Sequence, residues 1–149
     1  MATGDFVIFN AFLNDIATEG HNLDSDNLKL GIVDNSSPPT ASSATPNWGA
    51  HSANEVTAAG NYTADGVALA SSWIDAVTAT AATLDASDIT ISQDATNGFT
   101  NAYWGVLYND SHATDAAIGY VDLGGPVSEQ DGDVKIQWNA SGILKLSKT

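Results

Sequence analysis

The sequence contains no cysteine and no arginine, and it has only one methionine and three histidines among its 149 residues. The absence of cysteine excludes disulfide bonds, cysteine-ligated zinc, iron–sulfur clusters and thiol nucleophiles. Basic residues are scarce as well, because four lysines face 18 carboxylates and give a formal net charge of −14 at pH 7. Nucleic acid is therefore not an expected ligand, since the neutralisation of phosphates requires many Lys and Arg side chains.

Long apolar runs are also absent. No segment approaches the roughly 18 apolar residues of a membrane-spanning helix, and no basic region precedes the apolar residues near the N-terminus as it would in a signal peptide. We therefore expect neither a membrane segment nor a secretion signal. Apolar residues nevertheless make up 43% of the chain and charged residues only 15%, which is typical of a folded globular protein. The length suits one core, so we expect residues 1–149 to form a single domain.

The first apolar segment has helical spacing. At 100° per residue, its apolar side chains fall on one half of a helix, and Asn10, Asn14 and Thr18 fall on the other. Asp5 is of a type that caps helices, and Gly20 is of a type that ends them. This pattern predicts a helix over residues 5–18, although the run Phe-Val-Ile-Phe at 6–9 also suits a strand.

From residue 28 onward the apolar clusters are short, rich in Val, Ile, Thr and aromatic residues, and bounded by Gly, Asn, Asp or Ser, which is typical of β-strands. Short turns and the lack of helical crossovers favour antiparallel sheets. We therefore predict a mainly β protein, an antiparallel, jelly-roll-like β-sandwich of about eight strands. The predicted strands are 28–34, 67–73, 76–84, 88–92, 103–108, 118–123, 134–138 and 143–146.

Two other segments stand out. Residues 35–54 hold three of the four prolines together with many Ser, Ala and Asn residues, which predicts a long exposed loop. Residues 76–83 carry small residues on both faces of a predicted strand. This composition indicates either a close-packed sheet edge or a contact between subunits.

Few residues are of the types that catalyse reactions or bind metals. His21, His51 and His112 all lie in loop-like segments, so we interpret them as exposed turn residues rather than as catalytic groups. The carboxylates at 85–88 and 131–133 have the residue types of a calcium loop, but such Asp-Ser and Asp-Gly pairs more often form turns. No organised acid, base or nucleophile is visible. We therefore expect no catalytic residue, no bound metal, no cofactor and no enzymatic activity.

The apolar arc of the predicted helix is wide, and its three phenylalanines would make a costly exposed patch. The arc either covers an open end of the sandwich or docks on a neighbouring molecule. A tryptophan in the predicted exposed loop is a further candidate for an intermolecular contact. The candidate interface residues are Phe6, Phe9, Phe12, Leu13, Ile16 and Trp48.

Several segments, taken in order, have a familiar pattern. They are Ile-Phe-Asn-Ala-Phe at 8–12, His-Asn-Leu-Asp-Ser-Asp at 21–26, Leu-Lys-Leu-Gly-Ile-Val at 28–33, Asn-Glu-Val at 54–56, Gly-Asn-Tyr-Thr-Ala-Asp-Gly at 60–66, Trp-Gly-Val-Leu-Tyr-Asn-Asp at 104–110, Ile-Gly-Tyr-Val-Asp-Leu-Gly-Gly at 118–125 and Gly-Ile-Leu at 142–144. Over nearly the whole chain this resembles a family of small structural proteins of tailed double-stranded DNA bacteriophages. One departure is the turn at 63–66, which reads Thr-Ala-Asp-Gly where two glycines are expected.

The resemblance implies a virion component, namely a decoration or cement protein on the head surface that binds the major capsid protein and is soluble in the host cytoplasm before assembly. The acidic charge would keep free copies soluble and apart from DNA. A sandwich with small-residue faces is also expected to form a homo-oligomer, commonly a trimer. Two alternatives remain open: a tail or fibre module that recognises a host-surface glycan, suggested by Trp48, the tyrosines and the Asn/Asp-rich turns, and a depolymerase or calcium-dependent hydrolase.

Overall fold

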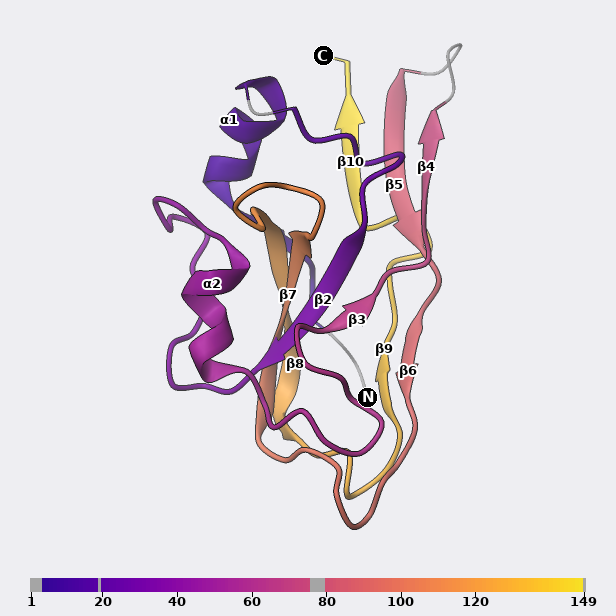
Figure 1. Cartoon of the computed structure of the whole chain (residues 1–149). Helices are drawn as coiled ribbons and strands as arrows, with labels where there is room; N and C mark the ends of the chain where they lie inside the picture. The colour runs from indigo at the N-terminus through magenta and orange to yellow at the C-terminus, as the bar shows by residue number, and fades with distance from the viewer. Residues whose placement is uncertain (1–3, 19, 76–79, 149) are drawn as a thin grey trace.

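A computed structural model describes residues 4–18, 20–75 and 80–148 of the chain. The protein is mainly β, with antiparallel sheets and few helices (Figure 1). No helix of the described part is long and apolar enough to cross a membrane. In chain order the elements are β1 (Val7–Ile8), α1 (Asn10–Thr18), β2 (Leu28–Val33), α2 (Trp48–His51), the short 3-10 turn η1 (Ser52–Asn54), β3 (Val67–Ala68), β4 (Ser71–Asp75), β5 (Ala81–Ala86), β6 (Ile89–Ile91), β7 (Ala102–Asn109), β8 (Ala117–Val127), β9 (Val134–Ile136) and β10 (Leu144–Ser147).

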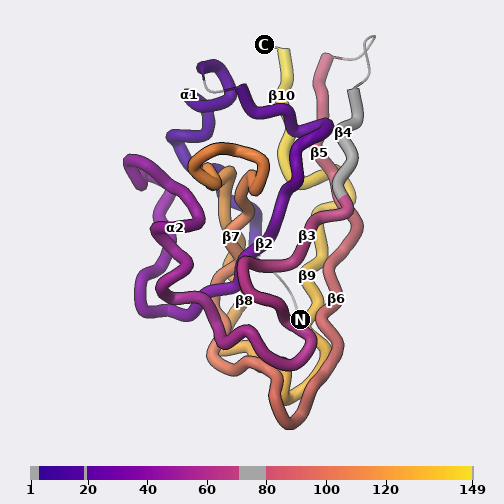
Figure 2. The backbone as a smooth tube through the Cα atoms, viewed as in Figure 1, coloured from indigo at the N-terminus to yellow at the C-terminus, as the bar shows by residue number. Residues whose placement is uncertain are grey.

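The strands form two layers in a sandwich-like arrangement. One layer is a five-stranded sheet in the order β1-β8-β7-β2-β3, and all of its pairings are antiparallel. The other layer holds a three-stranded sheet, β10-β5-β4, and a two-stranded sheet, β6-β9. Because β5 leads directly into β6, and β9 leads toward β10, the two small sheets follow one another along this layer (Figure 2). The coarse prediction of a mainly β, antiparallel protein is confirmed.

The core lies between these layers. Leu28, Leu30 and Ile32 of β2 are at most 1% exposed, which agrees with the alternation of apolar and polar residues in the sequence. They pack in one cluster with Leu84 of β5 and Ile136 of β9. The five-stranded sheet is also covered on its opposite face by the segment that contains α2, and for this reason β7 is buried along most of its length.

The predicted helix at 5–18 begins too early. Residues 7 and 8 form β1, which pairs with β8 through Val7 opposite Tyr120 and Ile8 opposite Gly119. The Phe9 N–H then donates to the Ile118 carbonyl, and α1 begins only at Asn10. The physical reason is tertiary, because this pairing covers what would otherwise be the free edge of β8.

The predicted strands agree well with the observed ones, apart from the missed β1 and two further differences. The segment predicted at 67–73 is divided into β3 and β4. Of the strand predicted at 76–84, residues 76–79 lie outside the described residues and β5 starts at Ala81. The predicted loop at 35–54 is not uniformly exposed, because it contains α2 and η1 and buries Trp48 and His51.

Candidate functional site

The apolar face of α1 points into the protein. Phe9 and Phe12 are completely buried, and Phe6 and Ile16 are half-buried against the core. As interface residues Phe9 and Phe12 are therefore wrong predictions, because their side chains are buried within the chain, whereas Phe6 and Ile16 stay predictions. The arc covers an open end of the sandwich, which is one of the two roles expected for it. Leu13, 57% exposed, is the most exposed of the predicted contacts on this segment.

Trp48 is also buried, at 4% exposed, so the prediction of an exposed contact in a loop is wrong for this residue. Asn47 caps α2 by accepting a hydrogen bond from the Ala50 N–H, and this fixes the orientation of the helix. The Trp48 ring stacks on Tyr108 with 5.1 Å between ring centroids and 4° between planes. Its Nε1 donates to Asp65 Oδ1 at 3.1 Å. Trp48 thus anchors the segment 35–54 to the outer face of the five-stranded sheet.

A second anchor lies beside it. The Tyr62 hydroxyl accepts a hydrogen bond from the Ile32 N–H at 2.9 Å and donates to Glu55 Oε1 at 2.7 Å. Burial is the main cause that raises the pKa of Tyr62 far above its ordinary value, and burial also raises the pKa of Glu55. Tyr62 is therefore a neutral bridge between β2 and the segment that follows η1.

The histidines are not exposed turn residues, contrary to the prediction. His51 is 7% exposed and stacks on Phe9 with 6.0 Å between ring centroids. Burial lowers the pKa of His51 below its ordinary value of 6.5. His21 and His112 are half-buried and stack on each other at 5.0 Å.

Asn109 contacts His21, one of the two stacked histidines. Its side chain is completely buried, and its Nδ2 donates to Asp26 Oδ2 at 2.6 Å and lies 3.0 Å from His21 Nδ1. Its Oδ1 accepts from the Ser111 N–H, which fixes the amide orientation. His21 Nδ1 therefore accepts from the Asn109 amide, and the His21 ring carries its proton on Nε2. The cluster ties the chain after α1 to the β7–β8 hairpin.

Glu129 joins a third pair of loops, and nothing in the sequence pattern singles it out. It is completely buried, with Oε1 accepting from the Asn61 N–H at 2.6 Å and Oε2 accepting from the Phe99 N–H at 3.3 Å. A Cβ atom at Gly60 would lie 2.7 Å from Glu129 Oε1, and Gly60 has φ +66°. Gly60, like Gly98, whose Cβ atom would lie 2.9 Å from Glu129 Cβ, leaves room for this close contact.

Three of the four carboxylates considered as calcium ligands accept hydrogen bonds from backbone N–H groups. Asp88 Oδ1 accepts from the Trp138 N–H at 3.0 Å, and Asp133 Oδ1 accepts from the Gln93 N–H at 2.9 Å. Asp85 Oδ1 accepts from the Ala86 N–H beside it. Across residues 4–18, 20–75 and 80–148, no three His, Asp or Glu side chains are grouped so as to hold a metal ion.

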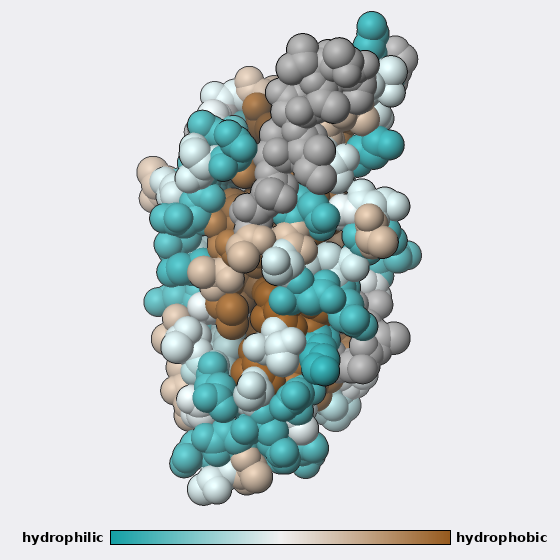
Figure 3. All heavy atoms as spheres, turned by 90° about the vertical axis from the view of Figure 1, so that its right-hand side faces the viewer, coloured by the Kyte–Doolittle hydropathy of each residue, from teal (hydrophilic) through white to brown (hydrophobic). Residues whose placement is uncertain are grey.

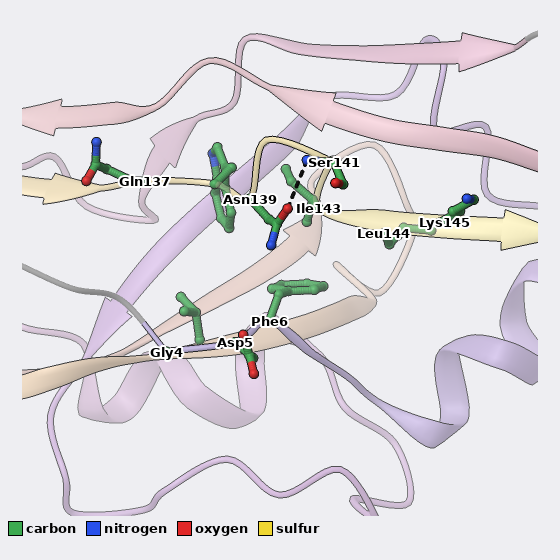
Figure 4. Close-up of a pocket in the computed structure, with 12 residues that line it drawn as sticks. Gly4, Asp5, Phe6, Gln137, Asn139, Ser141, Ile143, Leu144 and Lys145 are labelled. Atoms are coloured by element: carbon green, nitrogen blue, oxygen red, sulfur yellow. Dashed lines mark hydrogen bonds between the residues drawn. The ribbon is translucent and has the colours of Figure 1, made fainter.

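An open cleft of about 530 Å³ lies between the segment before β1 and the connection from β9 to β10 (Figure 4). Phe6 and Trp138 line it and meet edge to face, with 6.2 Å between ring centroids. Its charged lining groups are Asp5 and Lys145. Figure 4 shows the Asn139 side chain turned to the Ser141 N–H, from which it accepts a hydrogen bond of 2.9 Å. The cleft therefore has mixed polarity and lies where the edges of the two layers meet.

Three large apolar side chains of the described residues are more than a third exposed: Val7, Leu13 and Leu146, at 37%, 57% and 37%. They belong to β1, α1 and β10. On the side of the molecule that carries β5 and β6, hydrophilic residues surround a strip of apolar surface (Figure 3). The surface open to partners is thus made of small apolar areas within a polar, largely acidic exterior.

Comparison with known proteins identifies no relative of this chain. The chain matches no family model, no curated protein and no solved structure.

Proposed function

We propose that this protein is a structural component of a tailed bacteriophage and that it binds the outside of the head as a decoration or cement protein. The main observation behind the proposal is that buried polar side chains connect distant loops. Trp48, Tyr62, Asn109 and Glu129 each join two chain segments that are distant in sequence. The polar interior thus fixes loops in place, as a protein that acts by surface fit requires.

The sequence resemblance supports the same role, and the two-layered antiparallel arrangement is compatible with a jelly-roll-like domain. The partner in this proposal is the major capsid protein, and the protein acts without catalysis. Attachment depends on buried apolar area, with about 25 cal/mol per Å² as an upper guide before the costs of association. Many equivalent copies on one shell then give strong retention from individually modest contacts.

A glycan-binding tail module has lost its main support. That alternative was suggested by Trp48, the tyrosines and the Asn/Asp-rich turns, and of these Trp48 is covered by Tyr108 and hydrogen-bonded to Asp65. Stacking on a sugar requires an accessible aromatic face. The buried Trp48 therefore favours the head proposal over the tail alternative.

Cryo-electron microscopy of the parent particle tests the proposal. The expected result is density of this shape at symmetry-related positions over the capsid lattice. Heads that lack the protein, mixed with the purified chain, should take it up to a copy number set by icosahedral symmetry. Density confined to the tail, or no uptake by such heads, would overturn the proposal.

A further inference from the structure

The strand β10 has a free edge. It pairs with β5 on one side, and among the described residues no strand pairs with its other side. The Lys148 N–H donates to the Thr80 carbonyl at 2.8 Å, so the alternation of an antiparallel ladder turns the backbone groups of the even-numbered residues of β10 toward β5. The N–H and C=O groups of Lys145 and Ser147 therefore face away from the sheet. Unpaired groups of this kind are a template for an added strand.

Two clefts open along this edge. The cleft of about 530 Å³ is lined by Leu144 of β10 and by the pair Phe6 and Trp138 (Figure 4). A second cleft, of about 400 Å³, is lined by Leu146 of β10 and by Ile16 of α1. No residue of β5 lines either cleft, so both lie on the side of β10 that faces away from β5. In Figure 1 this side of β10 faces α1.

The inward face of β10 is apolar and only partly covered. Leu144 lies opposite Leu84 of β5, and both are buried. Leu146, the next residue on this face, is 37% exposed. Because residues two apart in a strand share a face, an added strand would place two alternate side chains beside Leu144 and Leu146 and so into the first and the second cleft. The edge is therefore suited to apolar residues at alternate positions.

The charge at this edge is positive in a chain that is otherwise strongly acidic. Lys145 lies in β10 and Lys148 directly follows it, so two of the four lysines are here. Lys29 is paired with Asp110 at 3.0 Å, whereas Lys145 and Lys148 form no salt bridge with a described residue. An acidic residue opposite Lys145 on an added strand would complete a cross-strand pair of opposite charge.

We propose that the free edge of β10 binds an extended peptide segment of a partner protein as an added antiparallel strand. The segment has an acidic residue opposite Lys145, flanked by apolar residues opposite Leu144 and Leu146. Asp5 and Asp24 line the two clefts and disfavour carboxylates there, which restricts the acidic residue to the outward face. Backbone hydrogen bonds supply affinity and the clefts supply specificity. On a phage head the segment belongs to the major capsid protein, and this identification, unlike the site, rests on the proposed function.

Titration with a synthetic peptide tests the site. The probe is a capped peptide, Thr-Leu-Glu-Leu-Glu-Leu-Thr, added to the purified chain and followed by NMR and amide hydrogen exchange. The amide protons of Lys145 and Ser147 should exchange at least about tenfold more slowly in the complex, because they donate to the peptide backbone. In an antiparallel pair the amides of the two glutamates face β10, so N-methylation of both should abolish binding. N-methylation of two leucines, whose amides face away, is the matched control and should be tolerated.

Charge variants test the assigned pairing. Lys145→Glu should raise the dissociation constant of this peptide at least about tenfold, and should lower that of the peptide with lysines in place of the glutamates. Lys135→Glu makes the same change in net charge on the exposed position of β9, and it should change the dissociation constant less than about twofold. Circular dichroism establishes that both variants are folded.

Failure of the native chain to bind the peptide would overturn the proposal, and so would binding that survives N-methylation of the glutamates or Lys145→Glu. Slow exchange of the Lys145 and Ser147 amides in the free chain at high concentration would also overturn it, because a second copy would then occupy the edge. None of these measurements needs a phage particle. A chain that binds the peptide but not phage heads keeps this site and loses the proposed function.

Discussion

Gly31 lies directly beneath the Trp48 ring, and a methyl group at this position provides a sharp test of the anchor. A Cβ atom built on Gly31 would lie 2.2 Å from two carbon atoms of the indole, and the three nearest atoms all belong to Trp48. Real Cβ atoms do not approach other atoms so closely, so in Gly31→Ala the ring must move away from β2. The backbone of Gly31 is paired with Val106 in the middle of the sheet and has little freedom to yield.

The cost follows from what Trp48 loses when it moves. The stack on Tyr108 is worth about 0.5–1.5 kcal/mol, and the hydrogen bond to Asp65 is worth a similar amount. Overpacking of a well-filled site adds to these losses. We expect Gly31→Ala to lower the free energy of unfolding by about 2–4 kcal/mol, measured by urea denaturation followed by circular dichroism.

Two controls make this result specific. Gly132→Ala should be neutral or slightly stabilising, because a Cβ atom there meets nothing within 4 Å. Trp48→Ala alone should cost about 3–5 kcal/mol. Adding Gly31→Ala to it should then cost less than about 0.5 kcal/mol, because the obstructing ring is gone. If Gly31→Ala is neutral in the native background, or equally costly with Trp48→Ala, the assigned role of Trp48 is refuted.

Three further predictions concern the other buried polar groups. Tyr62→Phe leaves the Ile32 N–H without its hydroxyl partner and should lower the free energy of unfolding by about 1–3 kcal/mol, as urea denaturation will show. Burial lowers the pKa of His51, so the unfolded state binds more protons than the folded state just below pH 6.5. Acidification in this range should therefore lower the free energy of unfolding of the native chain more than that of His51→Phe. Parallel plots of unfolding free energy against pH for the two proteins would contradict this. Burial raises the pKa of Glu55, so the folded state holds the Glu55 proton more tightly than the unfolded state does. The free energy of unfolding of the native chain, relative to that of Glu55→Gln, should therefore fall as pH rises from 4.5 through the folded pKa. A difference between the two proteins that does not change with pH would count against this prediction.

The strands were predictable because their signals are local. Leu28, Leu30 and Ile32 alternate with polar or small residues, and the alternation alone identifies the buried face. β1 was missed for the opposite reason. Its two residues lie within a segment of helical spacing, and only the pairing with Tyr120 and Gly119, far along the chain, makes them a strand. Two-residue strands of this kind depend on tertiary contacts rather than on their own composition.

The contact residues were less predictable than the fold. A Pro/Ser/Ala-rich segment normally indicates exposure, and the partners that bury Trp48, namely Tyr108 and Asp65, lie in other parts of the sequence. The same holds for Glu129, whose loops meet only in the folded chain. Sequence patterns report which face of one element is apolar, but they do not report which distant loop will cover it.

The order in which the strands pair has a consequence for biosynthesis. β1 pairs with β8, β6 pairs with β9, and β10, the last strand among the described residues, pairs with β5 and sets Leu144 opposite the buried Leu84. An N-terminal portion of the chain that ends before β10 therefore lacks at least one strand of the two layers. Pairing between strands that are far apart in the sequence also slows folding. We expect the nascent chain to acquire its native structure only after β10 has left the ribosome, and messages that end before β10 to yield products that are degraded or aggregate.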